Sequence, residues 1–425
     1  MALKINILSN EFVRPSSPTK DVFKKYQISS LDQIIPPISI PVILYYSHDE
    51  SSPTTQHDMS SRLRESLSDT LTLFYPLAGR LNKGDNSVDC NDMGVRYIEA
   101  KVDSLIMDVI GCDEAIVIDQ LIPPMNKIPS EVDEEELFVI QVNYFNCGGI
   151  AIGAYIPHKI ADGCSYFSFI TSWATISRGD IIVVKPSFIS SSLFPPKKNF
   201  VNQSPQLDLG TESLVTRKFV FIGSQIKTMR AKAKTDHPDM GEPTRVEVVT
   251  AFIWKYASGD KLRKEYIASH NVNLRTRMVP PVPEHVFGNL IGLGYAISKF
   301  EDSDLAILAR NVRDGIKTVN DEAIQMVRGE EGFAMMMEYV ENMSELLKSK
   351  EVELFRFSSW CRFGVYEADF GMGKPIWASL ASVNMKNFAL FIDSNSKDGI
   401  EAWVTMTEED MTRFQLAFAE ANSSE

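Results

Sequence analysis

The sequence predicts an α/β protein with two similar-sized domains, each built from a mixed β-sheet with flanking helices. The chain has 425 residues, 44% hydrophobic and 23% charged, which is enough for two large globular domains. Strand-like and helix-like runs alternate in both halves. Between them, residues 178–216 are rich in Pro and Ser with little periodicity. This indicates a crossover linker between an N-terminal domain over 1–177 and a C-terminal domain over 217–425.

The first half contains one clear helix and one clear hairpin. A stripe of apolar residues at helical spacing predicts a helix that ends before Pro76. Its members are Leu63, Leu67, Leu71 and Phe74. Residues 137–145 and 150–156 are typical of two strands joined by an Asn-Cys-Gly-Gly turn. His158 comes directly after the second strand, and a largely buried helix is expected beyond Gly163.

The second half repeats the same mixture of elements. It is expected to contain a strand over 214–222, helices over 224–234 and 246–256, and a strand over 266–274. Alternating apolar runs over 388–392 and 400–406 flank Asp398-Gly399, which predicts a hairpin. Thr407 and Asp410 then form a capping pattern for a final helix.

Charge and cysteine usage exclude several classes of function. The formal charge of -13 repels polyanions, so neither nucleic acid nor an anionic membrane surface is an expected partner. Five cysteines are scattered singly, and no His, Cys or carboxylate cluster has metal-ligand spacing, so no metal is expected. The N-terminus lacks signal-peptide and transit-peptide character, which favours a soluble cytoplasmic protein.

Common cofactor and hydrolase motifs are absent from the sequence. It has no Gly-x-Gly-x-x-Gly opening a helix, no Walker loop, no Gly-x-Ser-x-Gly and no His-Glu-x-x-His. Nicotinamide-dependent oxidoreduction, P-loop phosphoryl transfer, common serine hydrolysis and zincin-type proteolysis therefore lose most of their support.

Two strings remain as candidates for chemistry. His158 begins His-Lys-Ile-Ala-Asp-Gly at the end of a strand, where a side chain can face a cleft, whereas the other five histidines read as loop or core residues. His-x-x-x-Asp alone is weak, because roughly a third of such chains would show it by chance. The second string runs from Asp369 to Pro375 and packs two glycines and a proline around Phe370, which by itself indicates a tight turn.

With these two strings in place, the chain resembles the BAHD acyltransferases, plant enzymes that use acyl-CoA. The family pattern is His-x-x-x-Asp-Gly near the middle and Asp-Phe-Gly-Trp-Gly-Lys-Pro towards the end. Further matching strings, in family order, are Ser30-Leu31-Asp32 and residues 74–81, 272–277, 287–289 and 359–362. Within the family the chain looks most similar to alkaloid O-acetyltransferases. It departs from the pattern at Met372, which stands where the family has Trp and lacks an indole N–H donor.

The resemblance implies a chloramphenicol-acetyltransferase-like fold with its active site at the domain interface. It implies that His158 is the general base in direct transfer through a tetrahedral intermediate, with no acyl-enzyme on Cys164 or Ser165. Asp162 is implied to point away from His158 and to form a structural ion pair with Arg275.

Other residues follow from the resemblance in the same way. Asp369 is carried over as a second active-site residue, although its string looks structural. CoA contacts are expected at Thr244 and Arg245, where a helix N-terminus favours anions. The acceptor pocket is expected to include Ile34, Ile160 and Met372.

The resemblance thus implies a monomer that uses acyl-CoA, most simply acetyl-CoA, as co-substrate and holds no permanent cofactor. The expected acceptor is a hydroxyl group of a plant specialised metabolite such as a monoterpenoid indole alkaloid. Three alternatives stay open. The acceptor could be another alcohol, a phenolic or an amine, the protein could be a catalytically lapsed scaffold, or it could be a condensation-type domain. The last alternative normally has a second His where this chain has Pro157.

Overall fold

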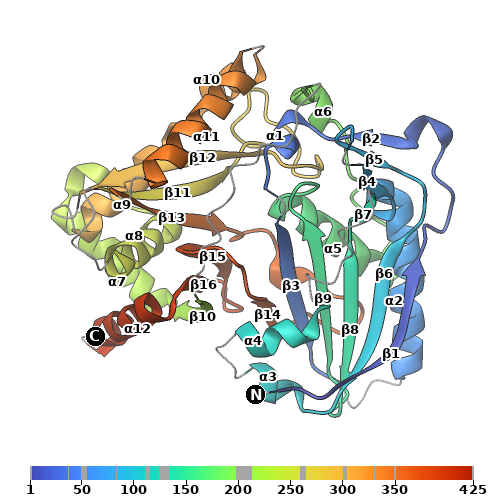
Figure 1. The fold of residues 1–425 in the computed structure, drawn as a ribbon. Helices are drawn as coiled ribbons and strands as arrows, with labels where there is room; N and C mark the ends of the chain where they lie inside the picture. The colour runs from blue at the N-terminus through green and yellow to red at the C-terminus, as the bar shows by residue number, and fades with distance from the viewer. Residues whose placement is uncertain are drawn as a thin grey trace. The chain divides into compact units, whose positions relative to one another are not determined.

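The computed structural model of the chain divides into two compact units, which are described separately (Figure 1). It describes residues 2–36, 38–48, 55–82, 84–110, 115–123, 134–197, 213–258, 265–299, 304–329, 331–348 and 351–423. Unit 1 comprises Met1–Ser204, Pro283–Leu290 and Phe363–Ser382. Unit 2 comprises Pro205–Val282, Ile291–Arg362 and Val383–Glu425.

A six-stranded mixed sheet forms the centre of unit 1 (Figure 1). Its order is β1 (Ile5–Val13), β6 (Val95–Val102), β8 (Val139–Phe145), β9 (Ile150–Pro157), β3 (Ser39–Tyr46) and β14 (Trp377–Leu380). β6 and β8 run parallel, and all other neighbours run antiparallel. The predicted hairpin is confirmed as β8 and β9, and both strands are buried along their whole length.

A smaller sheet and a set of helices complete unit 1. The small sheet has the order β2 (Lys25–Gln27), β5 (Ser87–Asp89), β4 (Arg80–Asn82) and β7 (Glu134–Glu136). The α-helices are α1 (Ser30–Gln33), α2 (Gln56–Leu73), α3 (Ile106–Ile110), α4 (Ala115–Ile118), α5 (Gly163–Ser177) and α6 (Ser190–Leu193). Short 3-10 turns are η1 (Asp21–Phe23), η2 (Tyr75–Ala78), η3 (Asp119–Leu121) and η6 (Val365–Glu367).

The predicted apolar stripe of α2 is buried, and it packs against α5. Trp173 on α5 donates its indole N–H to the Leu63 carbonyl oxygen at 3.1 Å, so the two helices are joined by a hydrogen bond as well as by apolar contact. The Trp173 ring also packs edge-on against Phe370, with 4.7 Å between the ring centroids. Phe370 belongs to the late string that the sequence analysis singled out, and it is fully buried in this core.

Unit 2 is built on a second six-stranded mixed sheet. Its order is β10 (Leu214–Phe221), β16 (Ile400–Thr407), β15 (Phe388–Asp393), β13 (Val352–Ser359), β11 (Glu265–Asn273) and β12 (Ile291–Ser298). β13 runs parallel to both β11 and β15, and the other pairs are antiparallel. The predicted C-terminal hairpin is confirmed as β15 and β16.

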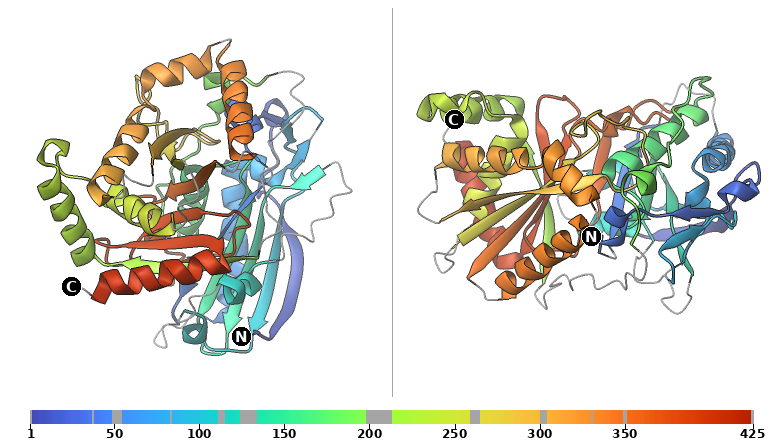
Figure 2. Two further views of the ribbon diagram at one scale, coloured as in Figure 1. Left: turned by 60° about the vertical axis from the view of Figure 1, so that its left-hand side comes forward. Right: turned by 90° about the horizontal axis from the view of Figure 1, so that it is seen from above.

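Unit 2 also contains helices, several of which pack on this sheet over an aromatic-rich core. They are α7 (Gly223–Asp236), α8 (Arg245–Ala257), α9 (Leu305–Lys317), α10 (Asp321–Arg328), α11 (Gly332–Lys348) and α12 (Glu408–Ser423), with the 3-10 turn η5 (Pro238–Met240). α12 lies along β10 and β16 (Figure 2). The predicted cap of α12 is confirmed, because the Thr407 hydroxyl accepts from the Asp410 N–H at 3.2 Å.

The predicted fold class is confirmed, since each unit holds a mixed sheet with helices packed on it. Unit 1 also takes in residues 283–290 and 363–382, which the sequence analysis assigns to the C-terminal domain. Residues 198–212 of the predicted linker lie outside the described residues. Within the described ranges, no helix has both the length and the hydrophobicity needed to cross a bilayer.

Candidate active site

His158 is held at the end of β9 by the pairing of β9 with β3. β9 ends at Pro157, whose register partner is Ser39 at the start of β3. One residue further, the His158 N–H donates to the Ile38 carbonyl oxygen at 2.7 Å. The strand pairing therefore fixes the backbone of His158, and its side chain is left partly buried.

The imidazole of His158 faces the side chain of Asn289, and the two atoms Nδ1 and Oδ1 are 2.9 Å apart. The amide nitrogen of Asn289 donates to the His158 carbonyl oxygen at 2.6 Å and to Oδ1 of Asp32 at 2.8 Å. A carbonyl and a carboxylate oxygen can only accept, so the amide NH2 must face them and its oxygen must face the ring. Nδ1 of His158 therefore carries the proton, and Nε2 keeps a free lone pair.

Asp32 is fully buried and accepts four hydrogen bonds. Its Oδ1 accepts from the Asn289 backbone N–H at 2.7 Å and from the Asn289 amide at 2.8 Å. Its Oδ2 accepts from the Ser29 N–H at 2.7 Å and from the Ser29 hydroxyl at 2.6 Å, which closes the N-terminal cap of α1. Burial raises the pKa of Asp32 to about 6, and the bonds from Ser29 and Asn289 oppose that rise. The carboxyl group is therefore mostly ionised at pH 7.

The surroundings of His158 favour its neutral form. Burial lowers the pKa of the imidazole below its usual value, because the charged ring would lose hydration. The hydrogen bond of the ring to its own backbone, the negative charge of Asp162 and the hydrogen bond to Asn289 act in the opposite direction and are smaller. A neutral ring with an unprotonated Nε2 can accept a proton near pH 7.

Asp162 holds backbone rather than the imidazole. Its Oδ1 accepts from the Ser165 N–H at 2.8 Å, which caps α5, and its Oδ2 accepts from the Leu290 N–H at 3.0 Å. The carboxylate is 2% exposed, so both bonds lie in the interior. Arg275 is fully buried in unit 2, where its backbone N–H donates to Oδ1 of Asn273 at 3.1 Å. The ion pair between Asp162 and Arg275 stays a prediction.

Residues 283–290 are bound by the first turn of α5. The Ser165 hydroxyl donates to the Gly288 carbonyl oxygen at 2.9 Å and accepts from the Gly288 N–H at 3.1 Å. The Cys164 thiol donates to the Glu284 carbonyl oxygen at 3.5 Å. Gly288 has φ +124°, and a Cβ there would come within 2.8 Å of the Ser190 hydroxyl, so only glycine fits. The hydroxyl and the thiol beside His158 thus hold the segment that carries Asn289.

Asp369 closes a tight turn with its own side chain. Its Oδ1 accepts from the N–H groups of Gly371 at 2.7 Å and Gly373 at 3.0 Å. Both glycines have positive φ angles, +89° and +84°. From α5, Ser177 donates to the Phe370 carbonyl oxygen at 2.9 Å, and the next residue, Arg178, donates to that of Asp369 at 2.7 Å. These are the contacts of a structural turn, and a catalytic role of Asp369 stays a prediction.

Comparison with known proteins places this site in a family. A family model described as the transferase family matches residues 3–421. The chain is 37% identical to vinorine synthase of Rauvolfia serpentina over 425 residues, which is 97% of this chain and 96% of that protein. It is 35% identical to stemmadenine O-acetyltransferase of Catharanthus roseus over 432 residues, 98% of each chain. The chain belongs to this transferase family. The resemblance to BAHD acyltransferases is thereby confirmed, and the protein is an acyltransferase.

Solved structures of other transferases share the fold. The crystal structure of vinorine synthase matches with a TM-score of 0.83 at 35% identity, covering 96% of both chains. The TRI101 protein of F. sporotrichioides, solved with coenzyme A and T-2, matches with a TM-score of 0.70 at 17% identity, covering 92% of this chain and 97% of that one. At that lower identity the likeness shows the fold alone.

The two residues carried over from the BAHD resemblance as CoA contacts serve unit 2 itself. Thr244 caps α8 by accepting from the Glu247 N–H at 3.2 Å, and Glu247 accepts from the Thr244 N–H at 2.8 Å in return. The Arg245 guanidinium donates to Asp393 and to the Lys397 carbonyl oxygen, both at 2.8 Å. The helix N-terminus already has a carboxylate and the guanidinium already has an ion pair. Binding of CoA by Thr244 and Arg245 stays a prediction.

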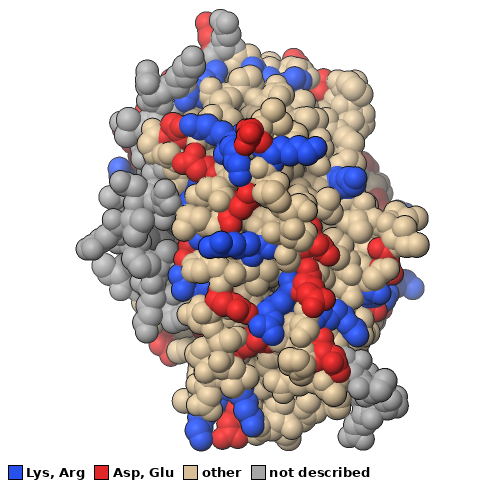
Figure 3. Space-filling model, turned by 90° about the vertical axis from the view of Figure 1, so that its right-hand side faces the viewer, with Lys and Arg blue, Asp and Glu red and all other residues tan. Residues whose placement is uncertain are grey.

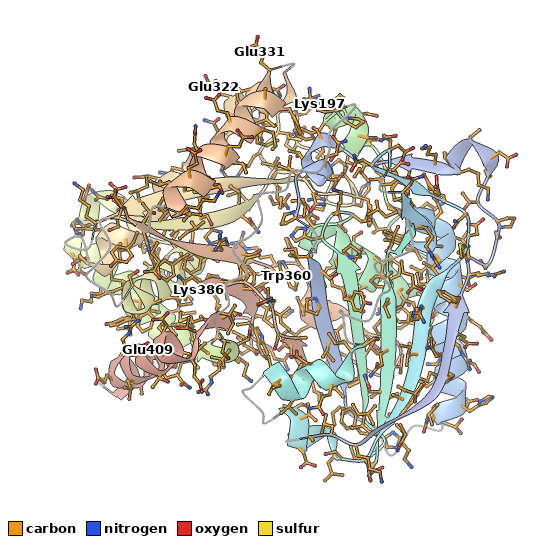
Figure 4. The ribbon with its side chains drawn as sticks, in the orientation of Figure 1. Lys197, Glu322, Glu331, Trp360, Lys386 and Glu409 are labelled. Atoms are coloured by element: carbon orange, nitrogen blue, oxygen red, sulfur yellow. The ribbon has the colours of Figure 1, made fainter. Side chains whose placement is uncertain are left out.

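Asp393 also binds the turn that carries the matching string at residues 359–362. Its Oδ2 accepts from the Arg362 N–H at 2.7 Å, while Oδ1 holds Arg245. Arg362 has φ +76°, and its side chain is exposed. The neighbouring Trp360 directly follows β13 and is buried, with its N–H donating to the Phe391 carbonyl oxygen at 2.7 Å (Figure 4). The string therefore shapes the end of β13.

The three predicted pocket residues all lie in unit 1. Ile34 follows α1 and is partly exposed, and Ile160 lies in the turn after His158 and is 1% exposed. Met372 is partly exposed between the two glycines of the Asp369 turn. Their role as acceptor-pocket residues stays a prediction.

Asn289, which hydrogen-bonds His158, and Asp32, which hydrogen-bonds Asn289, were not among the residues predicted for the site. Both belong to short strings that matched the family pattern, residues 287–289 and 30–32, and that match was the available signal. Neither string has a periodicity or a spacing from His158 that would place it beside the imidazole. The separations from their partners are 131 residues for His158 and Asn289 and 257 residues for Asn289 and Asp32.

Proposed function

We propose that the protein is an acyl-CoA-dependent O-acyltransferase that moves an acetyl group from acetyl-CoA to a hydroxyl group of a plant specialised metabolite, with His158 as general base. The observation that carries this proposal is the free Nε2 of a neutral His158 whose Nδ1–H is held by Asn289. A base in this state can take a proton from an alcohol near pH 7.

The acyl transfer proceeds in two steps. The acceptor oxygen attacks the thioester carbonyl carbon while Nε2 of His158 takes the hydroxyl proton, and a tetrahedral oxyanion forms. The oxyanion then collapses, the C–S bond breaks, and the protonated imidazole returns the proton to the leaving thiolate. The products are the ester and free CoA thiol, and no group stays on the protein.

CoA carries several negative charges, so its channel needs a local group of basic side chains. On the face of unit 1 that carries α2 and β1, acidic and basic side chains are interspersed and no patch of one sign dominates (Figure 3). Thr244 and Arg245 on unit 2 are the proposed phosphate contacts, and a phosphate there would compete with Asp393 and the Lys397 carbonyl oxygen for the Arg245 guanidinium.

The choice of acceptor is supported by the names of the relatives, which include a stemmadenine O-acetyltransferase and a salutaridinol 7-O-acetyltransferase of Papaver somniferum. A hydrophobic polycyclic alcohol such as an indole alkaloid is the proposed acceptor, with Ile34, Ile160 and Met372 as apolar pocket residues. A cytoplasmic monomer is proposed as the working form.

The test is acetyl-CoA-dependent thiol release with a pooled set of plant alcohols, with product masses naming the acceptor. His158→Ala should slow the acceptor-dependent reaction by about 10²–10⁴. His57→Ala, which changes an exposed histidine on α2, is the matched control and should keep the wild-type rate.

The outcomes separate the alternatives. Release with an amine or a phenolic would keep the reaction class and change the acceptor. No release from the wild type with any acyl-CoA, together with no CoA binding, would favour a lapsed scaffold. Transfer only from a carrier protein would indicate a condensation-type domain. Release that survives in His158→Ala would overturn His158 as the base.

A further inference from the structure

We propose that Asp32 is a positioning residue for His158: acting through Asn289, its carboxylate holds the imidazole in the tautomer whose Nε2 is free to accept a proton. This inference rests on the proposed function of His158 as general base and deepens it. Asp32 accepts its hydrogen bonds from Ser29 and Asn289, and its effect on the ring passes through the Asn289 amide.

The argument begins with the two orientations of the Asn289 amide. In the orientation observed, its NH2 group donates to Asp32 and to the His158 carbonyl oxygen, and its oxygen accepts from Nδ1–H. In the flipped orientation, the amide oxygen would face two acceptors at 2.6 and 2.8 Å, and the NH2 group would face Nδ1. The flip would then require the opposite tautomer, with the proton on Nε2. The observed orientation of this amide therefore favours the tautomer in which Nε2 can accept a proton.

Asp32 strengthens this choice in two ways. It accepts from the side chain and from the backbone N–H of Asn289, so it fixes the residue as a whole as well as its amide plane. Its negative charge makes both hydrogen bonds charge-assisted. Flipping the amide therefore costs more free energy than it would if the residue at position 32 were a neutral acceptor. A hydrogen-bonded chain from carboxylate to amide to imidazole also polarises each member in the same direction.

The cap of α1 does not by itself explain why the residue at position 32 carries a charge. The side chain is fully buried, and among the described residues its four donors are neutral groups from Ser29 and Asn289. Holding an ionised carboxylate in the interior without a cation is costly. Ser29 is already the N-cap of α1, and the return bond from Asp32 at the third helical position could be made by a neutral Gln at lower cost. An unbalanced charge that points along a hydrogen-bonded chain to the base is therefore best explained by its effect on that base.

The first test reads the tautomer of His158 directly and needs no acceptor. Full-length protein labelled with 15N-histidine is studied by NMR at pH 8, and the His158 signals are assigned by their loss in His158→Ala. The wild type should show a protonated Nδ1 and an unprotonated Nε2. Asp32→Asn should shift His158 towards a mixture of tautomers, because a carboxamide has one oxygen for four donors.

The matched control is Glu99→Gln, which changes a second buried carboxylate of unit 1. Glu99 lies on a strand of the six-stranded sheet. Glu99 accepts from Ser60, Tyr144 and Ser9 and lies on β6, two strands from β9, so its loss should lower stability and leave the His158 tautomer unchanged. If Asp32→Asn lowers the melting temperature as Glu99→Gln does while the His158 signals stay as in the wild type, the role of Asp32 is structural and the proposal is wrong.

The second test uses a double-mutant cycle on acetyl transfer. Asp32→Asn should lower kcat by up to about 10²-fold, because a misplaced reacting group loses its alignment, and should leave KM for acetyl-CoA nearly unchanged. In an Asn289→Ala background, Asp32→Asn should add little further loss of kcat, since the link is already broken. If the fold losses of kcat in the two single variants multiply in the double variant, Asp32 acts independently of Asn289 and the proposal is wrong.

The two readouts also keep the inference separate from the proposed function. A wild type without transferase activity would refute the proposed function, while the NMR experiment would still decide the tautomer. If Asp32→Asn fails to fold, Asn289→Ala breaks the same chain from the other side. It should give the same mixture of tautomers, and an unchanged His158 signal in that variant would refute the proposal.

Discussion

At the scale of single residues, chemistry is decided here by which atoms can donate and which can only accept. The Asn289 amide lies among an imidazole nitrogen, a carbonyl and a carboxylate, and only one arrangement satisfies all of them. Burial then keeps the ring neutral. The tautomer and the neutral charge of His158 therefore come from its neighbours, because an isolated imidazole has no preference strong enough to present one nitrogen.

The pH dependence of kcat/KM should reflect this environment. His158 must be neutral to accept a proton, so activity should be lost as the pH falls through its pKa. Because burial lowers that pKa, the acid limb should lie below the ordinary imidazole value of about 6.5. Asp32 also gains a proton below about pH 6, so the limb should be steeper than one proton allows. A limb centred above pH 6.5 would contradict this picture.

Asp162 should matter for stability more than for the chemical step. Asp162→Ala removes the cap of α5, leaves the Leu290 N–H without its acceptor and breaks the predicted pair with Arg275, at a cost of about 3–5 kcal/mol. Denaturant unfolding would measure it. A double-mutant cycle with Arg275→Met tests the ion pair, because coupled residues lose less together than separately. Fully additive losses would show that the two side chains do not interact.

At the scale of elements, the late motif behaves as a turn that is closed by its own aspartate and anchored to α5. Two glycines with positive φ bring their N–H groups to one carboxylate oxygen, and the buried Phe370 ring holds the turn against Trp173. The positive φ angles at Gly371 and Gly373 are the positions of this turn that favour glycine. Met372 lies between those glycines and is not needed to form the turn.

The Asp369 variants should separate geometry from charge. Asp369→Asn keeps an oxygen for both glycine N–H groups, so kcat should fall by less than about tenfold. Asp369→Ala loses that acceptor and should cost about 0.5–2 kcal/mol of stability, like the loss of a helix cap. Steady-state kinetics and thermal unfolding of both variants would check this. An equal, large loss of kcat in both, without loss of stability, would support the catalytic role carried over from the family.

At the scale of the whole molecule, unit 1 is assembled from three separate stretches of chain. β14 belongs to the stretch Phe363–Ser382, and it pairs with β3 at the edge of the sheet. Residues 283–290 bring the backbone N–H groups that satisfy Asp32 and Asp162. The partner of the base therefore comes from a stretch that lies between two strands of unit 2 in the sequence, β11 and β12.

A fragment limited to residues 1–204 should not fold on its own. It would lack β14, which leaves β3 as an open edge, and it would leave the buried carboxylates of Asp32 and Asp162 short of donors. Circular dichroism during heating should show no cooperative transition, whereas the full chain should show one. A sharp unfolding transition of the fragment would mean that the late stretches are dispensable for the fold.

The sequence by itself determined many of the elements, the fold class and His158 as the candidate base. Apolar periodicity located α2 and the hairpins β8–β9 and β15–β16, since that signal arises between residues close in the chain. The order of the motifs along the chain identified the family and picked out His158.

Only the tertiary structure decided which atoms surround His158. Asn289 lies 131 residues from His158, and Asp32 lies 257 residues from Asn289. Neither distance leaves a periodic trace in the sequence, because such contacts depend on where separate stretches of chain meet. The assignment of the proton to Nδ1, the neutral charge of the ring and the burial of Asp32 all follow from that meeting. They are properties of the packed structure and not of any local string of residues.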